Sequence, residues 1–502
     1  MVTAARDPLG VEGLAGGAAA VFYGEALLAT GVRVRHRDER QSTQGSRHAE
    51  TPRLGAMPGR NPARVARGAT AASVLTVAGA LGRPAPVEAL GASAKIGGTG
   101  SALHLPAAYM IFSPICEGYD ALTLLTLSQH AAVLGWLVAV FAAFRVLKRR
   151  ALGARAVRRR PMLTEAMLFG GVILGFAAVY VAGAVLPRPM AALTLDDPNE
   201  IAVDVHSHTS ASHDGRPGFD AEANRRWHAA AGFGAAYVTD HRYFAGAVAG
   251  AGANPARAGD GTVLLSGIES VAPHSRVTIL GARAEMALDE NGTVNAARLA
   301  RAPGVVIVLT TPASLASIPA TMRLDAVEIS DGAPRGLVFT RRLAPEIERF
   351  AMLRHLAPVA GSNNHGWGRT ASAWTILRIP AWRAMSPDSL DGAIRRALLR
   401  GGDWVRVIAR SSTPLPRSVG AVIATPALIV WGVITRLTAV ERFSWLAWIW
   451  SLAAVALLIG RRRTGDDSDD DPLPFPAQLP NGDARGDQPA VRHPHRGRPA
   501  AR

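Results

Sequence analysis

Long runs of uncharged residues alternate with charged segments along the chain. Four runs contain no Asp, Glu, Lys or Arg: residues 121–144, 167–187, 418–435 and 443–460. A bilayer core of about 30 Å is crossed by a helix of roughly 20 apolar residues. The runs therefore predict two transmembrane helical hairpins, at residues 121–187 and 418–460.

Between the predicted hairpins, short apolar runs alternate with segments of helix length. The strand-like runs are 201–205, 235–239, 263–267, 326–330, 358–362 and 373–379, and the helix-like segments are 219–231, 337–355 and 386–400. Strands that alternate with helices are typical of an α/β domain with a parallel sheet. We expect this domain to span residues 198–410.

The two ends of the chain lack such patterns. Residues 1–100 are rich in Gly, Ala, Pro and Arg, and residues 464–502 contain an acidic run and many prolines. Compositions of this kind do not bury enough apolar surface to fold, so we expect both ends to be disordered. The apolar run 71–81 is too short to span a membrane. Met57 and Met110 are alternative starts of translation.

The net charge of +16 is concentrated in arginine clusters beside the apolar runs. This placement favours membrane topology over nucleic-acid binding, so the bilayer is an expected partner and a nucleic acid is not. The basic segment 145–160 lies between the first two runs, and basic loops stay in the cytoplasm. We therefore expect a multi-pass protein of the plasma (inner) membrane with an extracytoplasmic domain. The lone Cys116 is compatible with that compartment.

The second predicted hairpin gives a conflicting signal. Arg461 to Arg463 favour a cytoplasmic C-terminus, whereas four complete spans place the C-terminus on the same side as an extracytoplasmic domain. The basic cluster of the first hairpin, at residues 145–160, is denser, so we use it to predict the topology. Four tryptophans in this region suit the aromatic belt at a membrane interface: Trp431, Trp445, Trp448 and Trp450.

A histidine-rich stretch follows the first hairpin. Of the 14 histidines, several gather between Ile201 and His241: His206, His208, His213, His228 and His241. The pair His206 and His208 ends an apolar run, and residues i and i+2 of a strand point the same way. Both imidazoles can therefore reach one metal ion, although a lone His-x-His pair is equally often a polar strand end.

Further metal-type side chains follow other predicted strands. Asp214 lies shortly after the histidine pair, Asp240 and His241 end the next strand, and Glu269 follows the third. Much later, His365 follows another strand after Asn363 and Asn364. In a (β/α) barrel, the carboxyl ends of the strands meet at one face, which holds the active site.

Four motifs resemble those of the PHP (polymerase and histidinol phosphatase) superfamily: HSHTSASHDG, VTDH, SGIE and GSNNH. The resemblance covers residues 200–405. It implies a distorted seven-stranded (β/α) barrel that binds divalent metal ions and hydrolyses phosphoesters. Carried over by motif, the implied ligands are His206, His208, Asp214, His241, Glu269 and His365, with Asn363 as a weaker one and His213 as an alternative to Asp214.

The sequence departs from the family pattern at three positions. Thr278 and Thr311 stand where the family usually has histidine, and Asn363 stands where it usually has aspartate. Threonine and asparagine are weaker ligands than imidazole or carboxylate. We therefore expect one or two ions of Zn, Mn or Fe rather than three, and His274 is a possible substitute ligand.

Other side chains have expected supporting roles. Asp240 is expected to orient a ligand histidine. Arg242 and Arg369 lie beside motif residues and are candidates to clamp a phosphate, or are simply solvated surface arginines. Glu328 and Asp331 flank a strand end, and we read them as solvated surface carboxylates rather than as support for the site.

The expected function is that of a membrane-anchored, metal-dependent phosphoesterase acting on a phosphorylated small molecule. Two alternatives remain open. The substitutions at Thr278, Thr311 and Asn363 suit a catalytically degenerate binding or sensing domain. A metal-dependent hydrolase of another bond is also compatible, because a barrel does not fix the reaction. The sequence contains no GxSxG, CxxC or Gly-rich nucleotide loop that favours serine-hydrolase, thiol-redox or kinase chemistry.

Overall fold

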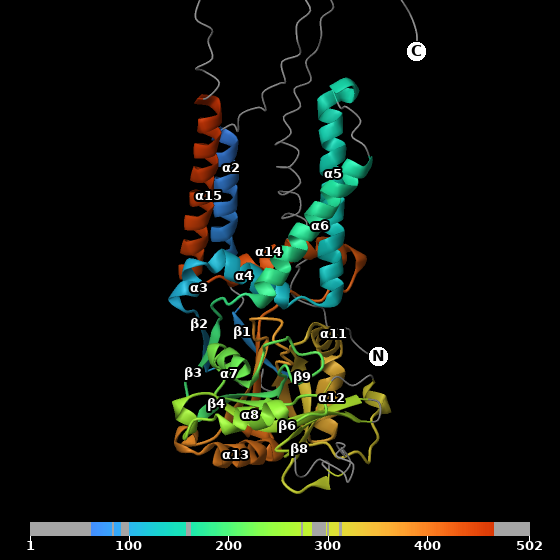
Figure 1. Cartoon of the computed structure of the whole chain (residues 1–502), viewed down its shortest axis with the longest axis vertical. Helices are drawn as coiled ribbons and strands as arrows, with labels where there is room; N and C mark the ends of the chain where they lie inside the picture. Colours follow the sequence, from blue (N-terminus) through green and yellow to red (C-terminus); the bar gives the residue numbers. More distant parts are fainter. Residues whose placement is uncertain are drawn as a thin grey trace, which may run out of the picture.

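The computed structural model describes most of the chain between residues 62 and 465. The described residues are 62–82, 85–91, 100–156, 162–272, 275–283, 298, 301–310 and 314–465. They form a domain built on a β-sheet and a set of long helices that extend away from it (Figure 1). The predictions for residues 1–61, His274, Thr311 and 466–502 lie outside the described residues.

The sheet domain contains ten strands and a small accessory pair. The ten are β1 (Val87–Leu90), β4 (Glu200–Ser207), β5 (Ala235–Val238), β6 (Val263–Ala272), β7 (Ser275–Leu280), β8 (Val306–Thr310), β9 (Ala326–Asp331), β10 (Ala357–Gly361), β11 (Ala373–Arg378) and β12 (Val405–Arg410). Their order is β1-β12-β11-β4-β5-β6-β7-β8-β9-β10. The accessory pair is β2 (Ser101–His104) and β3 (Ala192–Leu195).

Some helices pack around the sheet, and others form the set of long helices that extends away from it. Those of the sheet domain are α7 (Ala221–Ala230), α8 (Ala245–Gly252), α11 (Pro334–Arg342), α12 (Ala344–Leu353) and α13 (Pro387–Arg400). The others are α2 (Pro62–Ala78), α3 (Ala107–Ile111), α4 (Ser113–Thr123), α5 (Leu127–Ala156), α6 (Met162–Val185), α14 (Val419–Arg436) and α15 (Ala439–Gly465). Short 3₁₀ helices are η1 (Gly79–Leu81), η3 (Ala258–Asp260), η4 (Leu315–Ser317), η5 (Trp382–Ala384) and η6 (Gly402–Trp404).

The sheet curls until β10 lies beside β4. The backbone N–H of Asn363 donates to the carbonyl of His206 at 2.7 Å, and that of His208 donates to Asn364 at 2.9 Å. Strands β4, β5 and β6 are parallel, but β7 is antiparallel to both β6 and β8. The result is a curled mixed α/β sheet, which agrees with the expected α/β class but has more strands than the distorted (β/α)7 barrel that the resemblance implied. Too few residues separate β6 from β7 for the crossover helix that a parallel pair needs.

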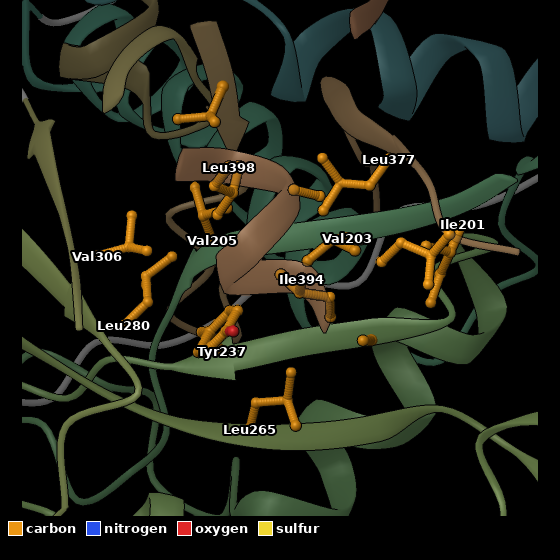
Figure 2. Close-up of a cluster of buried hydrophobic side chains, with 14 of the residues drawn as sticks. Ile201, Val203, Val205, Tyr237, Leu265, Leu280, Val306, Leu377, Ile394 and Leu398 are labelled. Atoms are coloured by element: carbon orange, nitrogen blue, oxygen red, sulfur yellow. The ribbon is translucent and has the colours of Figure 1, made fainter. Parts of the chain in front are cut away.

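The main apolar core lies between the sheet and α13 (Figure 2). Ile201, Val203 and Val205 alternate along β4, so their side chains share one face. They pack with Ile394 and Leu398 of α13, which repeat at helical spacing. Burying each such side chain contributes about 1.5–3 kcal/mol. This packing fixes β4 and therefore the place of the histidines at its end.

Part of the region that we expected to be disordered is folded. Helix α2 packs against α15, and β1 pairs with β12 in antiparallel register, with Val87 opposite Arg410. This corrects the expectation for these residues and extends the sheet beyond the predicted boundary at residue 198. Helix α2 and strand β1 both depend on partners more than 300 residues away in the chain, so local pattern does not indicate them.

Four helices in the described part are long and apolar enough to cross a bilayer: Leu127–Leu147, Leu163–Val185, Val419–Arg436 and Ala439–Ile459. Three of the four segments extend away from the sheet domain in Figure 1. The second predicted hairpin is not a simple antiparallel pair. Helix α15 packs mainly against α2, whereas α14 packs against α5 and η1.

Candidate metal centre

The His-x-His pair lies at the carboxyl end of β4, as the sequence predicted. His206 and His208 are 1% and 0% exposed. Their ring centroids are 5.1 Å apart. Imidazoles are rarely buried side by side without a common partner, since each carries a polar nitrogen that must be satisfied.

A single carboxylate oxygen is that common partner. Glu269 Oε2 lies 3.2 Å from His206 Nε2 and 3.3 Å from His208 Nε2. The same oxygen lies 3.1 Å from His241 Nδ1. A parallel bridge between His241 and Glu269 holds the end of β5 beside β6, which brings the third histidine to this point.

A second group of ligand-type atoms adjoins the first. Asp214 Oδ2 lies 3.3 Å from His241 Nε2 and 3.2 Å from His365 Nε2. His365 stacks on His208 with ring centroids 4.1 Å apart. The two nitrogens of His241 thus face the two groups, Nδ1 toward Glu269 and Nε2 toward Asp214. His213, the alternative to Asp214, is largely exposed but lies near His241.

The hydrogen bonding of these residues fits a bound cation. Both ring nitrogens of His208 and the Nε2 of His365 are buried without a hydrogen bond of acceptable geometry. Three sets of side chains place their ligand atoms close enough to hold an ion: His208, His241 and His365; His206, His208 and Glu269; and His213, Asp214 and His241. Mixed imidazole and carboxylate ligands suit Zn, Mn or Fe.

The pKa shifts of these side chains also fit a bound cation. Burial lowers the pKa of His208 to about 3, so its imidazole is neutral, the form that binds metals. Burial opposes the ionisation of Glu269, but the neighbouring imidazoles of His206 and His208 hold the pKa of that carboxyl well below its usual range. Burial also opposes protonation of His206, but Glu328 and Glu269 raise its pKa well above the usual value. The carboxylates of Glu269 and Glu328 therefore favour a cation at this point.

Glu328 belongs to this centre, which corrects our reading of it as a surface carboxylate. It is 1% exposed in the middle of β9, and its Oε2 lies 3.4 Å from His206 Nδ1. Burial, together with the charge of Asp331, raises the pKa of Glu328 to about 8. Asp331 is buried as well. Asp331 ends β9, so the strand-end rule that found Glu269 could also have found it, whereas Glu328 lies inside the strand and is not distinguished by that rule.

Arg276 is a second residue that sequence reasoning missed. Its Nη1 lies 3.0 Å from His241 Nδ1 and 3.4 Å from Glu269 Oε1, while its side chain is 47% exposed. It precedes Thr278 by two residues on β7, so the two side chains point to the same face. The two-residue spacing from Thr278 was the sequence signal that could have identified Arg276. A guanidinium is thus held between the metal-type cluster and solvent.

Asp204 and His228 form a buried pair behind the centre. His228 Nε2 lies 2.7 Å from Asp204 Oδ2, and both residues are fully buried. The other oxygen of Asp204 accepts from the backbone N–H of His206 at 3.0 Å and of Ser362 at 2.9 Å. The pair therefore ties β4 to the segment that leads to His365. His228, although part of the histidine-rich stretch, supports the centre and is not a ligand in any of the three sets.

The three predicted catalytic residues lie in different surroundings. Asp240 accepts from the N–H and hydroxyl of Thr209, at 2.6 and 2.7 Å, so it anchors the backbone after His208 rather than a ligand ring. Arg242 is exposed, with a φ of 63°. Arg369 donates through Nε to the carbonyl of Arg188 at 3.1 Å, which directs it toward the membrane helices.

The departures from the family pattern are also visible in the structure. Thr278 is the cross-strand neighbour of Glu269, and its buried hydroxyl has no hydrogen-bond partner. Asn363 has a φ of 43°, a rare conformation for a residue other than glycine. Its Nδ2 donates to Asp331 at 3.3 Å, and its Oδ1 has no partner. Neither side chain adds a strong ligand.

No family model matches this chain, and no curated protein does. Two solved structures are similar in part. One is a two-domain protein from Bacteroides vulgatus containing a predicted PHP-like metal-dependent phosphoesterase, with 15% identity and a TM-score of 0.26; the match covers 39% of this chain and 63% of that one. The other is PsfC from Pseudomonas syringae, with 18% identity and a TM-score of 0.31; the match covers 47% of this chain and 98% of that one.

Proposed function

We propose that this protein is a membrane-anchored, metal-dependent phosphoesterase that hydrolyses a phosphorylated small molecule. One observation carries the proposal: buried histidines from separate strands converge on Glu269 and Asp214 and leave ring nitrogens without other partners. The phosphoester as substrate rests on the four sequence motifs that resemble the PHP superfamily.

The ligand groups divide into two neighbouring sets. His206, His208 and Glu269 would hold one divalent ion, and Asp214, His241 and His365 would hold a second. Such an ion lowers the pKa of a coordinated water toward neutrality and neutralises the charge of a phosphoryl group. Glu328 contacts His206 on its other nitrogen and fixes the orientation of that ring.

Arg276 is the side chain best placed to bind the phosphate. Its guanidinium adjoins the ligand cluster at His241 and remains half exposed, so a substrate that enters from solvent meets it first. Guanidinium and phosphate pair through charge-assisted hydrogen bonds, which the fork geometry of arginine favours over lysine.

Replacement of Arg276 should separate substrate binding from metal binding. Arg276→Ala is expected to lower kcat/KM for a phosphoester by about 10- to 100-fold, since a hydrogen bond to a charged group contributes about 1.5–3 kcal/mol. Arg276→Lys should recover part of the loss. Bound metal, measured by elemental analysis, should stay unchanged in both variants. Loss of metal together with activity would show that Arg276 supports the ligands instead.

The function itself is tested by metal content and turnover in the same samples. The full chain is purified in detergent, because β1 belongs to the sheet and residues 198–410 alone would lack it. Phosphomonoester and phosphodiester substrates are offered to the wild type and to the double variant His206→Ala/His208→Ala. His104→Ala, an exposed histidine of β2, is the matched control. We expect bound metal and hydrolysis in the wild type and control, and neither in the double variant.

Two other results would contradict the proposal, and each would favour one of the alternative functions. Bound metal without turnover of any phosphoester favours a hydrolase of another bond. A folded protein with neither metal nor turnover favours a binding or sensing domain, which the partnerless hydroxyl of Thr278 beside Glu269 already makes the second candidate.

A further inference from the structure

Helix α14 is long and apolar enough to cross a bilayer, yet its start is tied to the domain side of the membrane helices. Gln129, in the first turn of α5, donates through Nε2 to the carbonyls of Thr413 and Pro414 at 3.3 and 3.0 Å. Further along, Trp136 Nε1 donates to the carbonyl of Ile423. The first turn of α5 is next to the sheet domain, because Arg341 of α11 donates to the carbonyl of Leu124 at 3.2 Å.

The end of α14 lies on the same side. Arg442, in the first turn of α15, donates through Nη1 to the carbonyl of Ile434 at 2.8 Å. This part of α15 is held by the end of α3, since Trp448 Nε1 donates to the carbonyl of Ile111 at 2.8 Å. Tyr109 of α3 in turn lies 3.3 Å from Arg410 at the end of β12. The start of α15 is therefore beside the domain.

A helix whose two ends lie on one side of the membrane does not cross it. In Figure 1, α14 runs across the direction of α5 and α15, near their ends that adjoin the domain. At 18 residues it is about 27 Å long, enough to reach from α5 to α15. Four apolar residues on one face are exposed on the described chain: Val419, Val422, Ile423 and Val430.

We propose that α14 lies in the plane of the membrane at the interface on the domain side, with its exposed apolar face in contact with lipid. Helices α5, α6 and α15 then cross the bilayer, and the residues after α15 lie on the side opposite to the domain. This arrangement removes the conflict in the sequence. Arg461 to Arg463 and the basic segment 145–160 fall on one side, which the distribution of positive charge identifies as the cytoplasm.

Two of the tryptophans are consistent with this arrangement. Trp431 lies in α14, and Trp445, Trp448 and Trp450 lie in the first turns of α15, which begins at the domain. With α14 in the membrane plane, Trp431 and Trp445 lie near one membrane surface, as an aromatic belt requires, whereas Trp448 and Trp450 lie about 14 and 17 Å from the start of α15. An apolar helix lying in that plane buries its exposed face in the boundary between headgroups and acyl chains.

Cysteine labelling of the full chain in intact cells tests the proposal. Cys116 is the sole cysteine and is buried, so the wild type is the background. Single cysteines are introduced as Asp403→Cys on the domain, Ala439→Cys at the first residue of α15, and Ala484→Cys in the C-terminal tail. A membrane-impermeant maleimide is applied before and after permeabilisation.

The proposal predicts that Asp403→Cys and Ala439→Cys label together in intact cells. It predicts that Ala484→Cys labels only after permeabilisation. A crossing α14 would instead put Ala439→Cys on the opposite side from Asp403→Cys and return Ala484→Cys to the domain side, which would overturn the proposal. If the first two label only after permeabilisation while Ala484→Cys labels before it, α14 still does not cross but the cytoplasmic assignment is wrong.

Discussion

Glu269→Gln is expected to lose bound metal and all measurable phosphoesterase activity while the protein remains folded. The amide keeps the shape of the side chain but removes the charge that the three histidines share through Oε2. Loss of a partner outside the ligand shell already costs about 10- to 100-fold in metal affinity, so loss of a direct ligand should exceed that. Elemental analysis and turnover of the full chain in detergent measure both effects.

A matched substitution elsewhere separates this effect from a general loss of a carboxylate. Glu222 is exposed on α7, where it pairs with Arg225 at 3.1 Å. Glu222→Gln should leave metal content and turnover at the wild-type level, since exposed pairs contribute about 0–1 kcal/mol. If Glu269→Gln retained full metal and activity, Glu269 would not be a ligand, and the proposed centre would have to be rebuilt around Asp214.

Asp120→Ala is expected to give the largest loss of stability. This residue of α4 is 1% exposed between two arginines, with Arg410 Nη1 at 2.7 Å and Arg188 Nη2 at 2.5 Å. Removing one partner of a buried ion pair costs about 3–5 kcal/mol, because the other charge stays buried without compensation. Thermal unfolding of the full chain in detergent should show a clear fall in the transition temperature.

The substitution Asp120→Ala should also affect the metal centre. The hydroxyl of Thr370 donates to Asp120 Oδ1 at 2.7 Å, and Thr370 ends the segment that carries His365. We therefore expect weaker metal binding as well as lower stability. Arg188, directly after α6, also donates to the Thr370 hydroxyl, at 2.9 Å. This segment thus joins the membrane part to the ligand cluster.

Glu117 provides the control for this prediction. It lies in the same cluster, but burial raises its pKa to about 7, so it is partly neutral near physiological pH. Glu117→Gln should accordingly cost much less stability than Asp120→Ala. Equal losses would mean that packing around α4, rather than the charge on Asp120, holds this junction together.

The sequence by itself was enough to propose the candidate ligands. His206 and His208 share a face because side chains alternate along a strand, and His241, Glu269 and His365 follow apolar runs that become parallel strands or their neighbours. Local periodicity and the strand-end rule indicated these residues as metal-type side chains, and the resemblance to the PHP motifs implied that they are ligands. The membrane helices were likewise predicted by length and lack of charge, which are properties of the chain alone.

Only the tertiary structure decided the features that depend on distant partners. Glu328 became part of the centre because the curl of the sheet brings β9 and β10 against β4. Arg276 reached His241 because β7 pairs antiparallel with β6. The placement of α14 depends on contacts with α5 and α15 that its uniform apolar sequence does not encode. Periodicity reports which face of an element is buried, but it does not report which element covers that face.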